Sequence, residues 1–287
     1  MLLNNIKKKI LELIFYVKLF IIKRLHKIIV PKKINIGGGS NFNEFSWLNY
    51  DVNSILTPFK FNENTSFPNK DNSINTVYTS HTLEHFSDKV VNKVLNEINR
   101  VLISRGSLLI IIPDYDFIIK KWREKDWNFF CNTQELGFNK HLKFWKNKNI
   151  SDNLDNRAAF MFCSYWNSDF ENRFRAFQSN KNNEYHPNVF WGPPNYDSEV
   201  IKSILLENSP KKIVDYLREM VIEKNSDYFF CHQNAWSKEE LIALVINSGF
   251  KLIESDKNII KNYPFSKSIK GFFDHYQLSN YFFFKKE

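Results

Sequence analysis

The chain has 287 residues, of which 43% are hydrophobic and 25% charged, as expected of a folded protein with one large domain or a core domain carrying an insertion. The formal net charge of +9 favours an anionic partner such as nucleic acid, anionic lipid or a phosphorylated substrate. The three cysteines lie far apart and form no C-x-x-C pair, which argues against a thiolate zinc site and against a secreted disulfide fold. A reducing cytoplasm fits this pattern.

The first predicted element is an amphipathic helix over residues 1–31, with Lys and Arg clusters on both sides of an apolar segment at 10–22. Two charged residues interrupt the apolar segment, so no run reaches the roughly 20 residues that a spanning helix needs. No small-residue cleavage site follows, which argues against a signal peptide. The helix could lie on an anionic membrane surface through residues 6–30, or pack on the protein's own core or a partner subunit. Pro31 ends it.

Strands and helices alternate after Pro31, which predicts an α/β sheet. Four strands are predicted, at residues 32–36, 47–53, 73–80 and 107–114. The last is a continuous apolar run, typical of a central parallel strand that is buried on both faces. Residues 88–103 carry an i, i+3, i+4, i+7 apolar stripe and form a helix capped by Ser87 or Asp88. The residues Ser-Arg-Gly at 104–106 turn the chain into the last strand.

The α/β rhythm is lost between Tyr115 and Asn234 and then returns. The interrupted stretch is too long for a loop and predicts an inserted helical lid or substrate subdomain over 115–234, with helices at 197–208 and 210–221. Residues 237–250 form a helix with a capping box, and two further strands follow. We therefore predict an N-terminal helix (1–31), an α/β core (32–114 and 235–287) and an insertion (115–234).

A glycine run follows the first predicted strand and suggests a nucleotide-binding loop. Gly37, Gly38 and Gly39 would let the backbone approach a ligand and present its N–H groups. The second strand ends at Asp51, where an acid can accept hydrogen bonds from ribose hydroxyls. The spacing from Gly39 to Asp51 is shorter than in dehydrogenases, and G-x-G-x-x-G is absent, so NAD is disfavoured and the crossover helix is short or degenerate.

Four stretches in this order resemble class I S-adenosylmethionine-dependent methyltransferases: "INIGGGS", "WLNYDVN", "DNSINTVYTSHTLEHF" and "LNEINRVLISRGSLLIIIPD". More narrowly, they are similar to the type 11-like methyltransferases predicted in surface-polysaccharide gene clusters. The later stretch "HQNAWSKEELIALVINSGF" resembles the C-terminal helix of that group. The resemblance covers about residues 33–114 and 232–287, and implies a Rossmann-like, mostly parallel sheet with helices on both faces. Gly38 departs from the pattern, which usually has an acidic residue, cysteine or alanine there.

The resemblance also implies roles for individual residues. The three glycines would face the methionine part of S-adenosylmethionine and Asp51 its ribose. Ser80 and His81 would lie beside the sulfonium, and Glu63 near the adenine. Asp114 ends a strand at the rim where open α/β sheets place substrates, or it caps the turn. The candidate catalytic residues are His85, His81 and Asp114.

The segment "SHTLEH" at 80–85 also spells H-x-x-E-H, a signature of one class of zinc peptidase. Such a peptidase needs the motif inside a long helix, whereas here it follows a strand and ends before the helix at 88, so a peptidase is excluded. Three interpretations stay open. Glu84 and His85 could fix the loop below the cofactor, His81 or His85 could act as a general base, or the cluster could hold a divalent metal with His186 or His232 as a further ligand. The sequence alone assigns no metal ligand.

The predicted function is methyl transfer from S-adenosylmethionine to a small-molecule or lipid-linked glycan, such as a sugar hydroxyl of a cell-surface glycan or glycolipid. The N-terminal helix would hold this cytoplasmic enzyme peripherally on the inner membrane face. The alternatives are an RNA methyltransferase, motivated by the net charge, and an inactive methyltransferase-fold binding module. Neither the acceptor nor the oligomeric state follows from the sequence.

Overall fold

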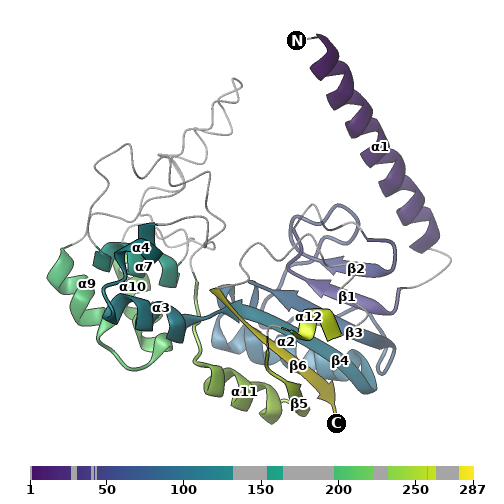
Figure 1. Ribbon diagram of the computed structural model, residues 1–287. Helices are drawn as coiled ribbons and strands as arrows, with labels where there is room; N and C mark the ends of the chain where they lie inside the picture. The colour runs from purple at the N-terminus through teal and green to yellow at the C-terminus, as the bar shows by residue number, and fades with distance from the viewer. Residues whose placement is uncertain are drawn as a thin grey trace.

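The protein is built around one six-stranded sheet in the order β2-β1-β3-β4-β6-β5 (Figure 1). The computed structural model describes residues 2–26, 31–39, 42, 44–131, 154–163, 197–222, 232–256, 258–262 and 278–287. The strands are β1 (Lys33–Ile36), β2 (Trp47–Tyr50), β3 (Ile74–Ser80), β4 (Leu102–Pro113), β5 (Phe250–Glu254) and β6 (Ser279–Lys286).

The strand directions confirm the predicted mostly parallel α/β fold. β1 pairs in parallel with β2 and β3, and β3 pairs in parallel with β4. β6 is antiparallel to both of its neighbours, β4 and β5. The chain leaves β1 toward β2 and then returns to the other side of β1 as β3. The sheet therefore has a topological switch point between β1 and β3, and ligands of open α/β sheets bind at such points, outside the carboxyl ends of the strands.

Helices cover both faces of the sheet. α2 (Asp88–Val101) and α11 (Lys238–Asn247) pack on one face, where alternate residues of β4 and β6 such as Ile110 and Phe282 are buried. The intervening residues Ile111 and Phe283 point to the other face, where the short α12 (Ile259–Asn262) contributes Ile259. The strands buried on both sides explain the continuous apolar run that the sequence shows there.

A second hydrophobic core lies beside the sheet, among helices between β4 and α11 (Figure 1). These helices are α3 (Tyr115–Arg123), α4 (Trp127–Cys131), α7 (Leu154–Cys163), α9 (Ser198–Leu205) and α10 (Pro210–Ile222). Their buried side chains include Trp122, Phe162 and Leu217. The sequence prediction of helices at 197–208 and 210–221 is confirmed. The segment "YHPNVFWGPPNY" (185–196) lies outside the described residues.

Two strand boundaries differ from the sequence prediction. The second strand ends at Tyr50 rather than at residue 53, because Asp51 leaves the ladder for an isolated bridge with Pro58. β4 begins at Leu102, directly after α2, and not at residue 107. Its register with β3 shifts between Ile74 and Thr76, so Ser-Arg-Gly at 104–106 is an irregularity within the strand and not a turn before it. Arg105 there has a positive φ of 59°.

The N-terminal helix α1 (Leu2–His26) extends beyond the sheet, and its N-terminal end is far from the other labelled elements (Figure 1). Six apolar side chains at helical spacing form one exposed face: Ile10, Leu13, Ile14, Val17, Phe20 and Ile21, each 49–65% exposed. Leu19 and Ile22 are buried. His26 Nε2 lies 2.8 Å from the Phe45 carbonyl oxygen, which holds the end of α1 at the loop before β2. No described helix is long and apolar enough to span a membrane.

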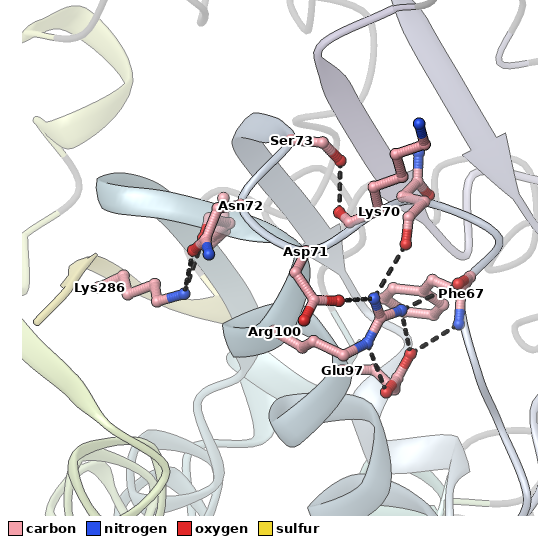
Figure 2. A network of polar contacts seen from close by, with 10 residues as sticks. Phe67, Lys70, Asp71, Asn72, Ser73, Glu97, Arg100 and Lys286 are labelled. Atoms are coloured by element: carbon pink, nitrogen blue, oxygen red, sulfur yellow. Dashed lines mark hydrogen bonds and ion pairs between the residues drawn. The ribbon is translucent and has the colours of Figure 1, made fainter.

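Arg100 on α2 fastens the loop that leads into β3 (Figure 2). Its guanidinium donates to the carbonyl oxygens of Phe67 and Asn69, to the Asp71 carboxylate at 2.6 Å and to Glu97 at 2.7 Å. Glu97 in turn accepts from the Phe67 backbone N–H at 2.7 Å. The Arg100 guanidinium lowers the pKa of the Glu97 carboxyl, although its burial acts in the opposite direction. One cation therefore fixes the chain immediately before the strand that forms one side of the switch point.

We expect Arg100→Met to lower the free energy of unfolding by about 2 kcal/mol, because it leaves the nearly buried Glu97 carboxylate and two carbonyl groups without their donor. Urea denaturation followed by circular dichroism measures this. Arg123→Met is the matched control, since Arg123 is exposed on α3. Equal stability of the two variants would contradict the assigned role of Arg100.

The same network makes the free energy of unfolding depend on pH in the acid range. Because the folded-state pKa of Glu97 is lowered, its contribution is present above the unfolded pKa near 4 and is lost as pH falls through the folded value. Unfolding of the wild type should therefore become easier below about pH 4. Arg100→Met should show a smaller acid effect, because it lacks the cation that lowers the Glu97 pKa.

Candidate functional site

The glycine loop begins directly at the end of β1 and packs against Thr82, two residues after the end of β3. Gly37 has φ of +78°, and a Cβ there would lie 1.9 Å from Thr82 Oγ1. The Thr82 hydroxyl donates to the Ser80 carbonyl, 2.9 Å away. Thr82 thus occupies the space that a side chain at 37 would need, so only glycine fits the contact between β1 and β3.

Gly38 is also enclosed, which explains its departure from the resembling sequences. A Cβ at Gly38 would lie 2.0 Å from Asn35 Nδ2 and 2.4 Å from Asn49 Oδ1. Those amides bond to each other at 3.3 Å, and Asn49 Nδ2 donates to the Gly39 carbonyl at 2.7 Å. Two buried asparagines therefore fill the volume that an acidic or other side chain would use.

Asp51 holds the loop from the neighbouring strand. Its Oδ2 accepts from the Gly39 N–H at 3.0 Å, and its Oδ1 accepts from the Asn53 N–H at 2.7 Å. A carboxylate oxygen has more than one acceptor position, so these bonds leave capacity for hydroxyl donors. The residue that the sequence predicts at a ribose therefore also positions the glycine loop.

A cavity of about 630 Å³ opens at the switch point, which is within the range of small-molecule sites. Predicted site residues that line it are Gly37, Asp51, His81 and His85. The other lining residues were not predicted as site residues from the sequence, and they are Val52, Asn53, Lys60, Phe61, Thr82, Phe86, Ser87, Val90 and Gln233. Five of these, Val52, Asn53, Thr82, Phe86 and Ser87, lie within two positions of a predicted lining residue, and that proximity was the available signal. Phe61 carried no signal of its own.

Residues 233 and 234 are fastened to the short 3-10 helix η1 (Leu83–His85). The backbone N–H groups of Gln233 and Asn234 both donate to the Glu84 carbonyl, at 2.6 and 2.9 Å. Their side-chain amides donate to the carbonyls of His85 and Phe86, at 2.9 and 2.6 Å. This four-bond clasp joins the segment before α11 to the loop after β3 and places His232 beside His85.

Glu84 is a fully buried carboxylate within a group of imidazoles. His81 Nδ1 lies 3.4 Å from Glu84 Oε1, but neither carboxylate oxygen accepts a hydrogen bond from the described residues. Burial acts to raise the pKa of Glu84, yet His81 foremost, with His85 and His232, holds that pKa below its ordinary value. The carboxylate is therefore ionised at neutral pH.

His232 is neutral and has a defined tautomer. Its Nδ1 lies 2.8 Å from the Phe162 carbonyl oxygen, which can only accept, so we assign the ring proton to Nδ1. The Tyr115 hydroxyl lies 2.9 Å from the same nitrogen and donates to the Asn234 carbonyl. Burial, followed by the charge of His85, lowers the pKa of His232 to about 3. The Nε2 atom therefore carries a lone pair.

Four predicted site residues, His81, Asp114, Glu63 and Ser80, make the following contacts. His81 has φ of +48°, and its Nε2 lies 2.9 Å from Ser279 Oγ, so its ring connects Glu84 to β6. Asp114 caps α3 by accepting from the Phe117 N–H, as the capping alternative holds. Glu63 is exposed and pairs with Lys89 at 3.8 Å. Ser80 ends β3. Ser80, Glu63 and Asp114 do not line the cavity.

The comparisons with known proteins agree with the fold. The family described as "Methyltransferase domain" matches residues 51–110, from Asp51 through β3 and α2 into β4. No curated protein matches the chain.

Solved structures show distant similarity. An S-adenosylmethionine-dependent methyltransferase from Mesorhizobium loti is 11% identical, with 92% of this chain and 96% of that chain covered and a TM-score of 0.37. PKMT2 from Rickettsia typhi in complex with AdoHcy is 11% identical, with 90% and 49% covered and a TM-score of 0.37. The complex between the Haloferax volcanii Trm112 methyltransferase activator and a methyltransferase is 10% identical, with 88% and 81% covered and a TM-score of 0.37. The assignment rests on the strand order and on the family match, because these scores are low.

The sheet order, the glycine loop at the switch point and the family match define the chain as a methyltransferase. It is an S-adenosylmethionine-dependent enzyme, and S-adenosylmethionine is its cofactor, as the sequence predicts.

The glycine loop offers a matched pair of substitutions. Gly37→Ala should weaken S-adenosylmethionine binding more than about tenfold, because the new methyl group displaces Thr82 at the cavity wall. Gly39→Ala should have a smaller effect. Gly39 has φ of +63° but open space around its Cβ, so the change adds only the left-handed backbone cost of about 1 kcal/mol. Isothermal titration calorimetry compares the two, with thermal melts to show that both fold. The opposite order of affinities would contradict this geometry.

Proposed function

We propose that this methyltransferase transfers the methyl group of S-adenosylmethionine to a sugar hydroxyl of a cell-surface glycan or glycolipid. The observation that carries this acceptor class is the exposed apolar face of α1. With basic residues on both sides of it, such a helix would bring the enzyme to the membrane, where lipid-linked glycans are built. The sequence resemblance to methyltransferases of surface-polysaccharide gene clusters supports the same acceptor.

The lining of the cavity suggests where S-adenosylmethionine and the methyl acceptor would each bind. Gly37 and Asp51 would hold the cofactor at one end, while His85 and Gln233 line the part that borders the buried imidazoles. Methyl transfer from a sulfonium is an in-line displacement with a good leaving group, so alignment can supply most of the rate enhancement. His85 is our candidate catalytic residue, because it lines the cavity while His81 and Asp114 make the structural contacts described above.

The helices with the second hydrophobic core are the proposed acceptor-binding part. Their core includes Tyr115, two residues after the end of β4, and Ala235, three residues before the start of α11. Both ends of this segment therefore join the sheet near the carboxyl end of β4, next to the cavity side of the switch point. We propose the predicted insertion at 115–234 as a lid or substrate subdomain on this basis.

The RNA alternative requires cations and exposed aromatic rings around the cavity. Among the described lining residues, Lys60 is the one lysine, and Arg is absent. The described part of the cavity therefore favours a neutral acceptor. An inactive binding module would keep cofactor binding and lack transfer to any acceptor.

Wild-type enzyme with radiolabelled S-adenosylmethionine should label a lipid-linked glycan fraction and leave total RNA unlabelled. Asp51→Ala should abolish the transfer, because it removes the acceptor of the Gly39 and Asn53 N–H groups and a wall of the cavity. Glu239→Ala, which changes an exposed acid on α11, serves as the matched control. Labelled RNA would support the RNA alternative instead, and absence of label in both fractions despite cofactor binding would contradict the proposed acceptor class.

The membrane contact is tested by flotation with vesicles containing anionic lipid. Leu13→Gln with Val17→Gln should release the protein from these vesicles, because both exposed residues lie on the apolar face of α1. Val200→Gln with Leu206→Gln removes two exposed apolar residues elsewhere and should leave flotation unchanged. If the wild type fails to float, α1 is a packing element and the membrane proposal is wrong.

A further inference from the structure

The described residues contain one group of metal-ligating side chains that the methyl-transfer scheme does not use in full. One ligand atom each from Glu84, His85 and His232 can be chosen such that all three lie within 4.8 Å of one another. The His85 and His232 rings meet edge to face, with centroids 4.8 Å apart. The clasp between residues 233–234 and η1 holds this arrangement, because it fixes the backbone on both sides.

The buried carboxylate of Glu84 has no hydrogen-bond donor among the described residues. Buried polar groups are nearly always hydrogen-bonded, and a buried charge is nearly always paired. Glu84 is 0% exposed, and neither of its oxygens accepts a hydrogen bond from the described residues. His81 approaches one oxygen at 3.4 Å, and this contact leaves the other oxygen unmatched. If Glu84 had only a structural role, its carboxylate would be expected to accept hydrogen bonds from backbone or side-chain groups.

His232 has the second-sphere contact that is typical of a metal ligand. Ligating imidazoles almost always donate their other ring N–H to a carbonyl, a carboxylate or water, which fixes the tautomer. His232 Nδ1 makes this contact with the Phe162 carbonyl at 2.8 Å. The Nε2 atom on the other side of the ring is then the one that can face a ligand.

We propose that Glu84, His85 and His232 bind one divalent transition-metal cation at the edge of the cavity. Two imidazoles and a carboxylate match Zn²⁺, which binds three protein ligands and keeps an open position at catalytic sites. Ligand atoms around a tetrahedral ion with bonds of about 2.1 Å lie roughly 3.4 Å apart. The present spacing of up to 4.8 Å would therefore contract by up to about 1.4 Å through side-chain rotation.

The position of His85 gives the cation a role that rests on the proposed function. His85 lines the cavity, so an ion beside it borders the place of the acceptor. The cation would lower the pKa of an acceptor hydroxyl. The hydroxyl proton passes to solvent, the oxygen forms a bond to the methyl carbon, and the carbon–sulfur electron pair returns to sulfur. The products are the methyl ether and S-adenosylhomocysteine.

Calorimetric titration of chelator-treated full-length protein with Zn²⁺ tests the site without any methyl acceptor. We expect one ion per chain in the wild type and in His26→Asn, which removes an imidazole outside the group. His85→Asn and Glu84→Gln should bind at least tenfold more weakly. His85 is only partly buried, so His85→Asn keeps the test valid if Glu84→Gln does not fold. A wild type without stoichiometric zinc, or a folded His85→Asn that binds as tightly, overturns the proposal.

The role of the ion has a separate readout. Methyl transfer should fall on chelation and return with Zn²⁺, whereas unchanged transfer by chelated protein overturns the catalytic role. If no glycan is methylated under any condition, the proposed function fails, while the titration still decides whether the site exists.

Discussion

The hydrogen bonds between residues 233–234 and the carbonyls of 84–86 are the interaction on which the site depends. Two backbone and two side-chain donors from Gln233 and Asn234 pair with three consecutive carbonyl groups. A 3-10 turn cannot satisfy all of its own carbonyls, so a partner segment must supply donors. Because Gln233 and Asn234 follow the helical segment in the chain, the same bonds attach the end of that segment to the sheet.

The clasp also determines the chemistry of the loop after β3. It brings His232 to His85 and helps to seal Glu84 from solvent. Below the loop, Thr82 packs against Gly37, so the cofactor side and the imidazole side share one short segment. A change at Gly37 or at His232 is therefore transmitted to the other side through three or four residues of backbone. The loop after β3 forms the common wall of both parts of the cavity.

Much of the core could be predicted because local pattern and tertiary structure agree there. The apolar stripe of α2, the capping box of Ser237 and Glu240, and the apolar run of β4 each specify their element before any packing is known. The start of β4 was misplaced, because the irregularity at 104–106 has the residues of a turn, whereas Leu102 before it and Ser107 after it both pair with β3. Asp51 and Gly37, which line the cavity, could be singled out because their chemistry and their position at strand ends coincide.

The imidazole group shows where sequence pattern stops being sufficient. The spacing H-x-x-E-H suggests a helix face, yet η1 is a single turn, and His81 points to Ser279 as well as to Glu84. His232, one of two candidates from the sequence, completes the group among the described residues, and the clasp places it there. The other candidate, His186, lies outside the described residues. Burial then changes its character, since a histidine enclosed beside another imidazole stays neutral and can act only through its lone pair. Long-range hydrogen bonds, which leave no periodic signal, thus decide which of several polar residues can take part in chemistry.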